Sequence, residues 1–108
     1  MPKYLALFKY SPEAAKGFLK EKATAREAEI RKAYEGIGGK VEAVYWAASG
    51  EYTGVVIAEV PDSATGAAFS MVVGSSGALD AAVAMELLTS SELDRALSKA
   101  ISYRPPGD

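Results

Sequence analysis

The chain has 108 residues, of which 49% are hydrophobic and 24% are charged, and its formal net charge is −2; these are ordinary values for one globular domain. It contains no cysteine and no histidine, which excludes disulfides, thiol nucleophiles, zinc sites built from Cys or His, and histidine acid–base chemistry. The negative charge does not attract phosphate backbones, and the apolar runs are shorter than the ~20 residues that span a bilayer, so we expect a cytoplasmic protein that binds neither nucleic acid nor membrane.

The N-terminal part of the chain predicts a strand followed by two helices. Lys3–Tyr10 is rich in aromatic residues and leucine, which is typical of a strand. Ser11-Pro12-Glu13 predicts a helix start, because serine caps free amides and proline suits the first helical position. Thr24 and Glu27 have the spacing of a capping box, which predicts the start of a second helix that ends at Gly38-Gly39.

The rest of the chain predicts a hairpin, a helix and a last strand. Val41–Ala48 and Thr53–Val60 are β-rich runs joined by a segment in which Gly50 suits a positive φ, so they should pair antiparallel. Asp62 is placed to cap a third helix. Leu79–Leu88 predicts the last strand, although its alanines would also suit a helix.

A second capping-box spacing, between Thr89 and Glu92, predicts a small C-terminal docking helix whose apolar stripe reaches Ile101. The order of elements is βαββαβ with this helix appended. That order is ferredoxin-like, a four-stranded antiparallel sheet with its two main helices on one face. We therefore expect an α+β fold with a single domain in residues 1–102 and a flexible tail in residues 103–108.

Strand alternation divides the predicted sheet into a helix-covered face and an open face. It places Tyr45, Val83 and Met85 under the helices and Trp46 on the open face. The open face is too apolar to be left in water, which predicts a homodimer or larger assembly through this face. The residues expected at the subunit contact are Lys9, Trp46, Ile57, Glu59 and Glu86.

Three of these residues have a second interpretation. Glu59 and Glu86 would serve as a general acid–base pair if a closed interface raised one pKa. The alternative is an interface salt bridge to Lys9. Trp46 has the alternative of stacking on a ligand instead of packing between subunits.

Five polar side chains are candidates for ligand binding. Tyrosine hydroxyls directed between sheet and helices would suit an aromatic or polyketide-like molecule. A cavity of roughly 300 Å³ or more, lined by Tyr10, Tyr45 and Tyr52, would favour binding or catalysis, and a filled core would favour pure assembly. An arginine early in the second helix could bind a carboxylate or phosphate. The alternative is that the hydroxyls bond to backbone or water and the arginine is solvated. The candidates are Tyr10, Arg26, Tyr34, Tyr45 and Tyr52.

Several short motifs occur in a characteristic order: the opening strand, Gly38-Gly39-Lys40-Val41, Gly50-Glu51-Tyr52 and Pro61-Asp62. With its motifs in that order, the chain resembles the GYD domain family. Gly50-Glu51-Tyr52 matches the first three positions of the family's Gly-x-Tyr-Asp signature. Thr53 stands where the family usually has aspartate. The resemblance implies a dimeric α/β-barrel type of fold and no established general function, and the missing acid argues against a catalytic role for this segment.

Three functions follow as hypotheses. The first is a small homo-oligomeric protein that binds a small, largely apolar metabolite without metal or cofactor. The second, supported by fold analogy alone, is a cofactor-independent monooxygenase or isomerase acting on a small aromatic substrate. The third is a structural module whose sheet face only assembles subunits.

Overall fold

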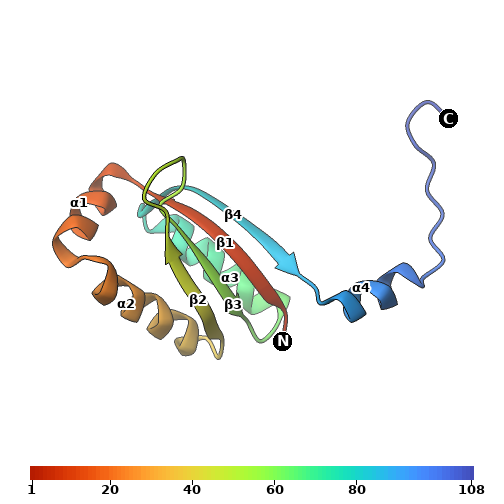
Figure 1. Ribbon diagram of the computed structural model, residues 1–108, viewed down its shortest axis with the longest axis horizontal. Coiled ribbons are helices and arrows are strands. Elements are labelled where there is room, and N and C mark those ends of the chain that lie inside the picture. Colours follow the sequence, from red (N-terminus) through yellow and green to blue (C-terminus); the bar gives the residue numbers. More distant parts are fainter.

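The computed structural model describes all residues, 1–108, and has an α+β fold. Its four strands form one antiparallel sheet in the order β2-β3-β1-β4, the ferredoxin-like arrangement that the sequence predicts. In Figure 1, helix α3 lies behind the strands and α1 and α2 lie beside β2. The elements are β1 (Lys3–Tyr10), α1 (Pro12–Glu21), α2 (Ala23–Gly36), β2 (Lys40–Trp46), β3 (Gly54–Glu59), α3 (Ser63–Ser75), β4 (Leu79–Leu87) and α4 (Ser90–Leu97).

Most helix starts follow the capping signals in the sequence. The Ser11 hydroxyl accepts a hydrogen bond from the amide of Ala14, and an Asp62 carboxylate oxygen accepts one from Thr65 at 2.8 Å. Both hydrogen bonds of the Thr89–Glu92 capping box form. These local bonds fix where α1, α3 and α4 begin, because they satisfy amides that have no partner inside the helix.

The capping box predicted at Thr24 does not form. Helix α2 begins at Ala23, directly after Lys22, so Thr24 is already inside the helix. Glu27 instead accepts a hydrogen bond from Arg31 one turn later, at 3.0 Å. The prediction was wrong because α1 runs on to Glu21 and leaves only Lys22, with φ of 70°, to turn the chain.

A bulge in β2 reverses the faces predicted for its second half. Val41 pairs with Ala58 and Ala43 with Ile57, which leaves Glu42 as an extra residue. An extra residue shifts every later side chain to the other face. Trp46 therefore lies on the helix-covered side, stacked on Phe18 of α1 at 4.8 Å, and Tyr45 is on the open face with 67% of its surface exposed.

The faces predicted for β4 are also reversed. Residues directly opposite each other in an antiparallel pair share a face, and Met85 lies opposite Leu5, Val83 opposite Leu7 and Glu86 opposite Tyr4. Val83 and Met85 are thus on the open face, while Glu86 is on the helix side and not among the open-face residues as predicted. Alanines occur at both phases of this strand, so its sequence alternation does not distinguish the two faces.

The two halves of the sheet are packed to different densities. The buried cluster consists of side chains on β1, β2 and β3, and Ile30 and Tyr34 of α2 pack against it. Helix α3 and strand β4 contain no fully buried residue. The cluster consists of Phe8, Val41, Val44, Val56 and Ala58.

The predicted C-terminal docking helix is present but does not dock. Helix α4 lies beyond the end of β4, away from the sheet (Figure 1). The radius of gyration of 16.7 Å exceeds the about 13 Å of a compact chain of this length. The helix ends at Leu97, so the apolar stripe is shorter than the predicted one through Ile101. None of the helices has the length and apolar character needed to cross a membrane.

The position of Trp46 can be tested by its fluorescence, because it is the only tryptophan of the chain. Replacing Phe18 by alanine removes the ring that stacks on Trp46. Because Phe18 is half-buried, we expect a loss of about 2 kcal/mol in the free energy of unfolding, measured in urea. The Trp46 emission should shift to longer wavelength.

The matched control is Leu19→Ala, at the next position of α1, whose side chain is exposed. It should change the free energy of unfolding by less than about 0.5 kcal/mol and leave the emission unchanged. An emission spectrum that Phe18→Ala does not alter would place Trp46 on the open face after all.

Candidate functional site

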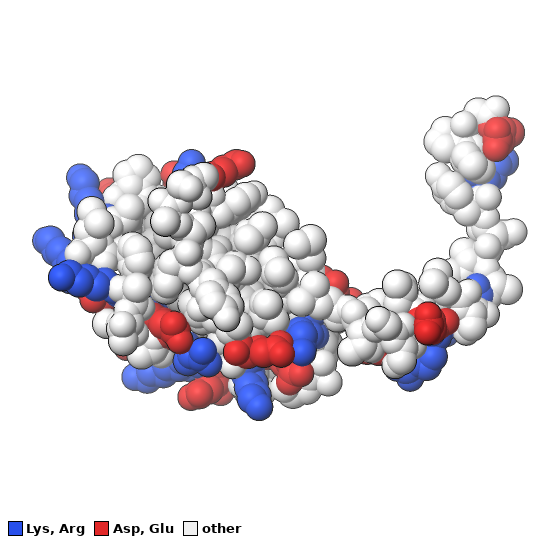
Figure 2. Space-filling view, viewed as in Figure 1, with Lys and Arg blue, Asp and Glu red and all other residues white.

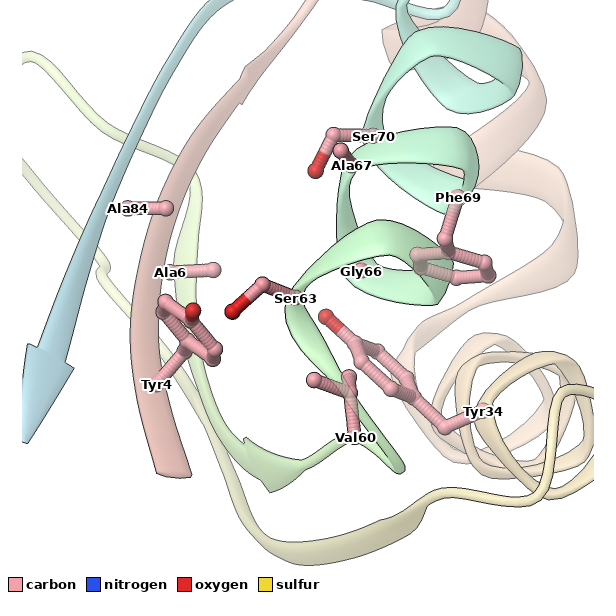
Figure 3. Close-up of a pocket in the computed structure, with 10 residues that line it drawn as sticks. All are labelled: Tyr4, Ala6, Tyr34, Val60, Ser63, Gly66, Ala67, Phe69, Ser70 and Ala84. Carbon is pink, nitrogen blue, oxygen red and sulfur yellow. The ribbon is translucent and has the colours of Figure 1, made fainter. Parts of the chain in front are cut away.

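A cavity of about 240 Å³ lies in the loosely packed half of the molecule, between α3 and strands β1 and β4. Ala6 and Ala84 form its floor on the sheet, and Gly66 and Ala67 form the opposite wall on α3 (Figure 3). All four residues have a methyl side chain or none. The space exists because small residues face each other across the layers, where larger ones would fill it.

The start of α3 fixes the width of the cavity at one end. Asp62 caps the helix there, and Gly66 lies so close to β3 that a Cβ atom on it would be 3.2 Å from the side chain of Val60. The pKa of Asp62 is lowered, chiefly because its carboxylate accepts the backbone hydrogen bond of Thr65. The cap therefore stays charged and bonded at neutral pH, which fixes the residue at which α3 begins.

Hydroxyl groups are the polar part of the cavity. Figure 3 shows the hydroxyls of Tyr4, Ser63 and Tyr34 directed toward the space between β1 and α3. The hydroxyl of Ser70 lies further along α3, at the other end of the cavity. No charged side chain lines the walls. The Tyr34 ring packs against Phe69 at a centroid distance of 4.7 Å, and burial raises the pKa of Tyr34. Tyr34 therefore remains a neutral phenol that can both donate and accept a hydrogen bond.

The five predicted ligand candidates do not come together. Tyr34 lines the cavity. At the other end of β1, Arg26 donates a hydrogen bond from Nε to the Tyr10 hydroxyl at 3.3 Å. Tyr45 is exposed on the open face, and Tyr52 is half-buried in the loop between β2 and β3. The cavity thus contains one of the candidates, and Tyr10 with Arg26 forms a separate pair.

Three hydroxyl-bearing residues of the cavity were missed from the sequence: Tyr4, Ser63 and Ser70. A signal for the serines exists. Ser63, Gly66, Ala67 and Ser70 stand at i, i+3, i+4 and i+7, one face of a helix that carries only small or hydroxyl side chains. Such a face cannot fill the space against a sheet, and the polar groups on it then face inward.

Thr53, which stands in place of the signature aspartate, has a structural role. Its hydroxyl oxygen accepts a hydrogen bond from the amide of Tyr10 at 3.1 Å, and its own amide donates to the carbonyl of Phe8 at 2.7 Å. These bonds tie the end of β1 to the loop before β3. A hydrogen-bond acceptor is what this position needs, and threonine supplies one without a charge.

Lys9 lies far from the two glutamates with which it was expected to share the subunit contact. Glu59 pairs with Lys3, six residues before Lys9 along β1, or about 20 Å away. Lys3 instead contacts Glu42 at 2.9 Å, and the hydrogen bond to Glu42 raises the pKa of Lys3. Glu59 and Glu86 border a groove of about 280 Å³ next to the start of β1 and the end of β4. No group of three or more acidic side chains is placed to hold a metal ion.

The raised pKa of Tyr34 gives a pH dependence with a defined sign. The unfolded chain loses this proton near the usual value of about 10, while the folded protein keeps it to higher pH. The stability contributed by the neutral phenol is therefore complete below about pH 10 and is lost as the pH rises through the folded pKa. As the pH rises above about 10, the free energy of unfolding should fall more steeply in the wild type than in Tyr34→Phe.

Absorbance of the tyrosinate form measures the same group directly. The difference between the titration curves of the wild type and Tyr34→Phe isolates Tyr34. A midpoint in the folded protein no higher than in urea would contradict the burial of its hydroxyl.

Two comparisons with known proteins bear on this fold and cavity. Proteins with curated functions include no match to the chain. The profile of the GYD domain matches residues 4–97, which run from the second residue of β1 to the last residue of α4 and include Thr53 and every wall of the cavity. The chain belongs to the GYD domain family.

Proposed function

We propose that this protein is a homo-oligomeric binding protein that holds a small, neutral, largely apolar molecule between α3 and the sheet. The cavity lined by hydroxyls and methyl groups is the observation that supports this proposal. Pockets for drug-sized ligands usually measure about 300–1,000 Å³. A volume of about 240 Å³ lies below that range and favours a ligand the size of a single substituted ring.

The chemistry of the walls favours a neutral ligand. A carboxylate or phosphate would lose its hydration without meeting a cation, since no lysine or arginine lines the cavity. The hydroxyls of Tyr4, Tyr34 and Ser63 instead suit one or two neutral oxygens, such as those of a phenol or a ketone. The rest of such a molecule would rest against Ala6, Ala84 and Phe69.

The walls favour binding over the monooxygenase or isomerase hypothesis. Proton abstraction from a substrate needs a base within hydrogen-bond reach, and the cavity contains no carboxylate, lysine or histidine. Its half-buried tyrosine, Tyr34, has a raised pKa, which makes the phenolate a scarcer species. Tyr34 is better suited to donate a hydrogen bond to a bound oxygen.

Self-association is the second part of the proposal. The open face carries Leu5 and Leu7 of β1, opposite Ile57 and Val55 of β3. Figure 2 views this face and shows the strands free of charged side chains, which gather along the margins. A soluble monomer rarely exposes so continuous an apolar patch, and a second copy offers the same surface around a two-fold axis.

Ligand binding is testable by thermal denaturation with two neutral probes, phenol and cyclohexanone, and with benzoate as the charged counterpart. A probe at 100 times its Kd stabilises the folded state by about 2.7 kcal/mol. We expect phenol and cyclohexanone to raise the Tm and benzoate to have no effect. If all three fail, or benzoate alone stabilises the protein, the proposed ligand class is wrong.

A matched pair of variants locates the site. Ala67→Leu fills the cavity and should abolish the probe-induced rise in Tm without lowering the Tm itself. Ala68→Leu adds the same side chain at the next, exposed position of α3 and should leave the response to the probes intact. Equal effects of the two variants would mean that the probes bind elsewhere.

Self-association is testable by light scattering at micromolar concentration. We expect the mass of a dimer or a larger assembly, and dissociation to monomers in Ile57→Glu, which places a charge at the centre of the open face. Tyr45→Glu, at an exposed position of the same face, should weaken the assembly without affecting the fold. Val72→Glu, on the exposed side of α3, is the control. A monomeric wild type contradicts the proposal.

A further inference from the structure

Helix α4 carries an apolar stripe that nothing in its own chain covers. Leu93 is 47% exposed and Leu97 is 73% exposed. The helix has eight residues, and isolated helices shorter than about 12–15 residues are marginal in water. A capping box at Thr89 helps it to begin, but a helix of this length needs a surface to pack against.

The body of the same chain does not provide that surface. Glu92 is the residue of α4 that borders the groove next to Lys3 and Pro2. Leu93 and Leu97 are turned from Glu92 by about 100° and 140° around the helix axis. Thr89 has extended backbone angles, with φ of −71° and ψ of 164°, and α4 continues outward from the end of β4, away from its own sheet (Figure 1).

The exposed stripe of α4 would enlarge an interface formed through the open face. A stable interface buries about 800 Å² of accessible surface on each partner. Helix α4 lies beyond the end of β4, at the margin of this face (Figure 1), and its leucines are exposed. Packing them against a second copy would add apolar area to the contact between two sheets.

Strand β4 offers a matching surface on the second copy. It is an edge strand, and its open-face residues are all apolar, from Ala81 to Leu87. Val83 is 41% exposed and Met85 is 47% exposed, whereas Leu7 on the central strand is only partly exposed. Both this row of side chains on β4 and the leucine stripe of α4 are uncharged, so the two surfaces could pack together without burying a charge.

We propose that the C-terminal arms are exchanged between copies: α4 of one copy packs Leu93 and Leu97 against the open-face side of β4 of a second copy. This inference rests on the self-association proposed above. It adds that the contact is reciprocal, with each copy providing one arm and receiving one.

The absence of native cysteine makes the exchange directly measurable. Copies with Leu97→Cys and copies with Val83→Cys, which carry tags of different mass, are co-expressed and treated with a short bis-maleimide. We expect a product with the summed mass of the two tagged chains. Copies with Lys20→Cys, on the distant helix α1, replace the Leu97→Cys copies in the control and should give no such product.

Each other result has a defined meaning. A dimer in light scattering without the product between Leu97→Cys and Val83→Cys copies overturns the exchange and leaves the proposed self-association standing. A monomer in light scattering overturns both. Cross-linking that occurs only within one chain, in a variant with both cysteines, shows that the arm folds back on its own sheet and also overturns the exchange.

A second pair of variants tests the energetic role of the stripe. Leu97→Asp should raise the dissociation constant of the assembly at least about tenfold. Ser91→Asp adds the same charge on the opposite side of α4, where it also suits the first helical turn. It should change the dissociation constant by less than about twofold. Equal dissociation constants for the two variants would overturn the exchange.

Discussion

The bulge at Glu42 is the constraint on which the rest of the structure depends. It brings Val41, Val44 and Trp46 onto the helix-covered side of β2. Val41 and Val44 are three residues apart, so without the bulge they would lie on opposite faces of the strand. Trp46 then meets Phe8 at 5.9 Å and Phe18 at 4.8 Å, and large aromatic side chains of this kind bury about 150–250 Å² each. Without the extra residue, Tyr45 would occupy the core and α1 would lose the ring on which it packs.

This dense half of the molecule explains why the other half can remain loose. The valine and aromatic cluster holds β1, β2 and β3 together under α2. Helix α3 and β4 then need only their own attachments, the cap at Asp62 and the hydrogen-bonded pairing of β4 with β1. A cavity in this half costs stability, because its walls lack dispersion partners. The rigid half makes that cost tolerable, and a ligand would recover part of it.

Local signals in the sequence were sufficient to predict the strands, the hairpin and three of the four helix starts. Ser11, Asp62 and Thr89 act on amides within three residues, so their effect does not depend on the rest of the fold. The failures are non-local. Thr24 has the right spacing for a cap, but the length of α1 places it inside a helix.

The assignment of residues to faces failed for the same reason. Val41-Glu42-Ala43-Val44 reads as alternation in either phase, and only pairing with β3 reveals that Glu42 is the extra residue. The cavity was predicted only through Tyr34, since most of the other lining residues are alanine, glycine and serine. Small residues indicate a space only when it is known what faces them.

Strand β4 connects the candidate site to the open face. Ala84 forms part of the cavity wall, while its neighbours Val83 and Met85 point to the opposite side of the sheet, opposite Leu7 and Leu5. The strand has one hydrogen-bonded neighbour, β1, and no buried side chain, so it is among the segments that open most readily. Any partner that packs against Val83 and Met85 restrains the backbone that carries Ala84. Assembly through this face would therefore be linked to the shape of the cavity through a single strand, with Ala84 as the point of contact.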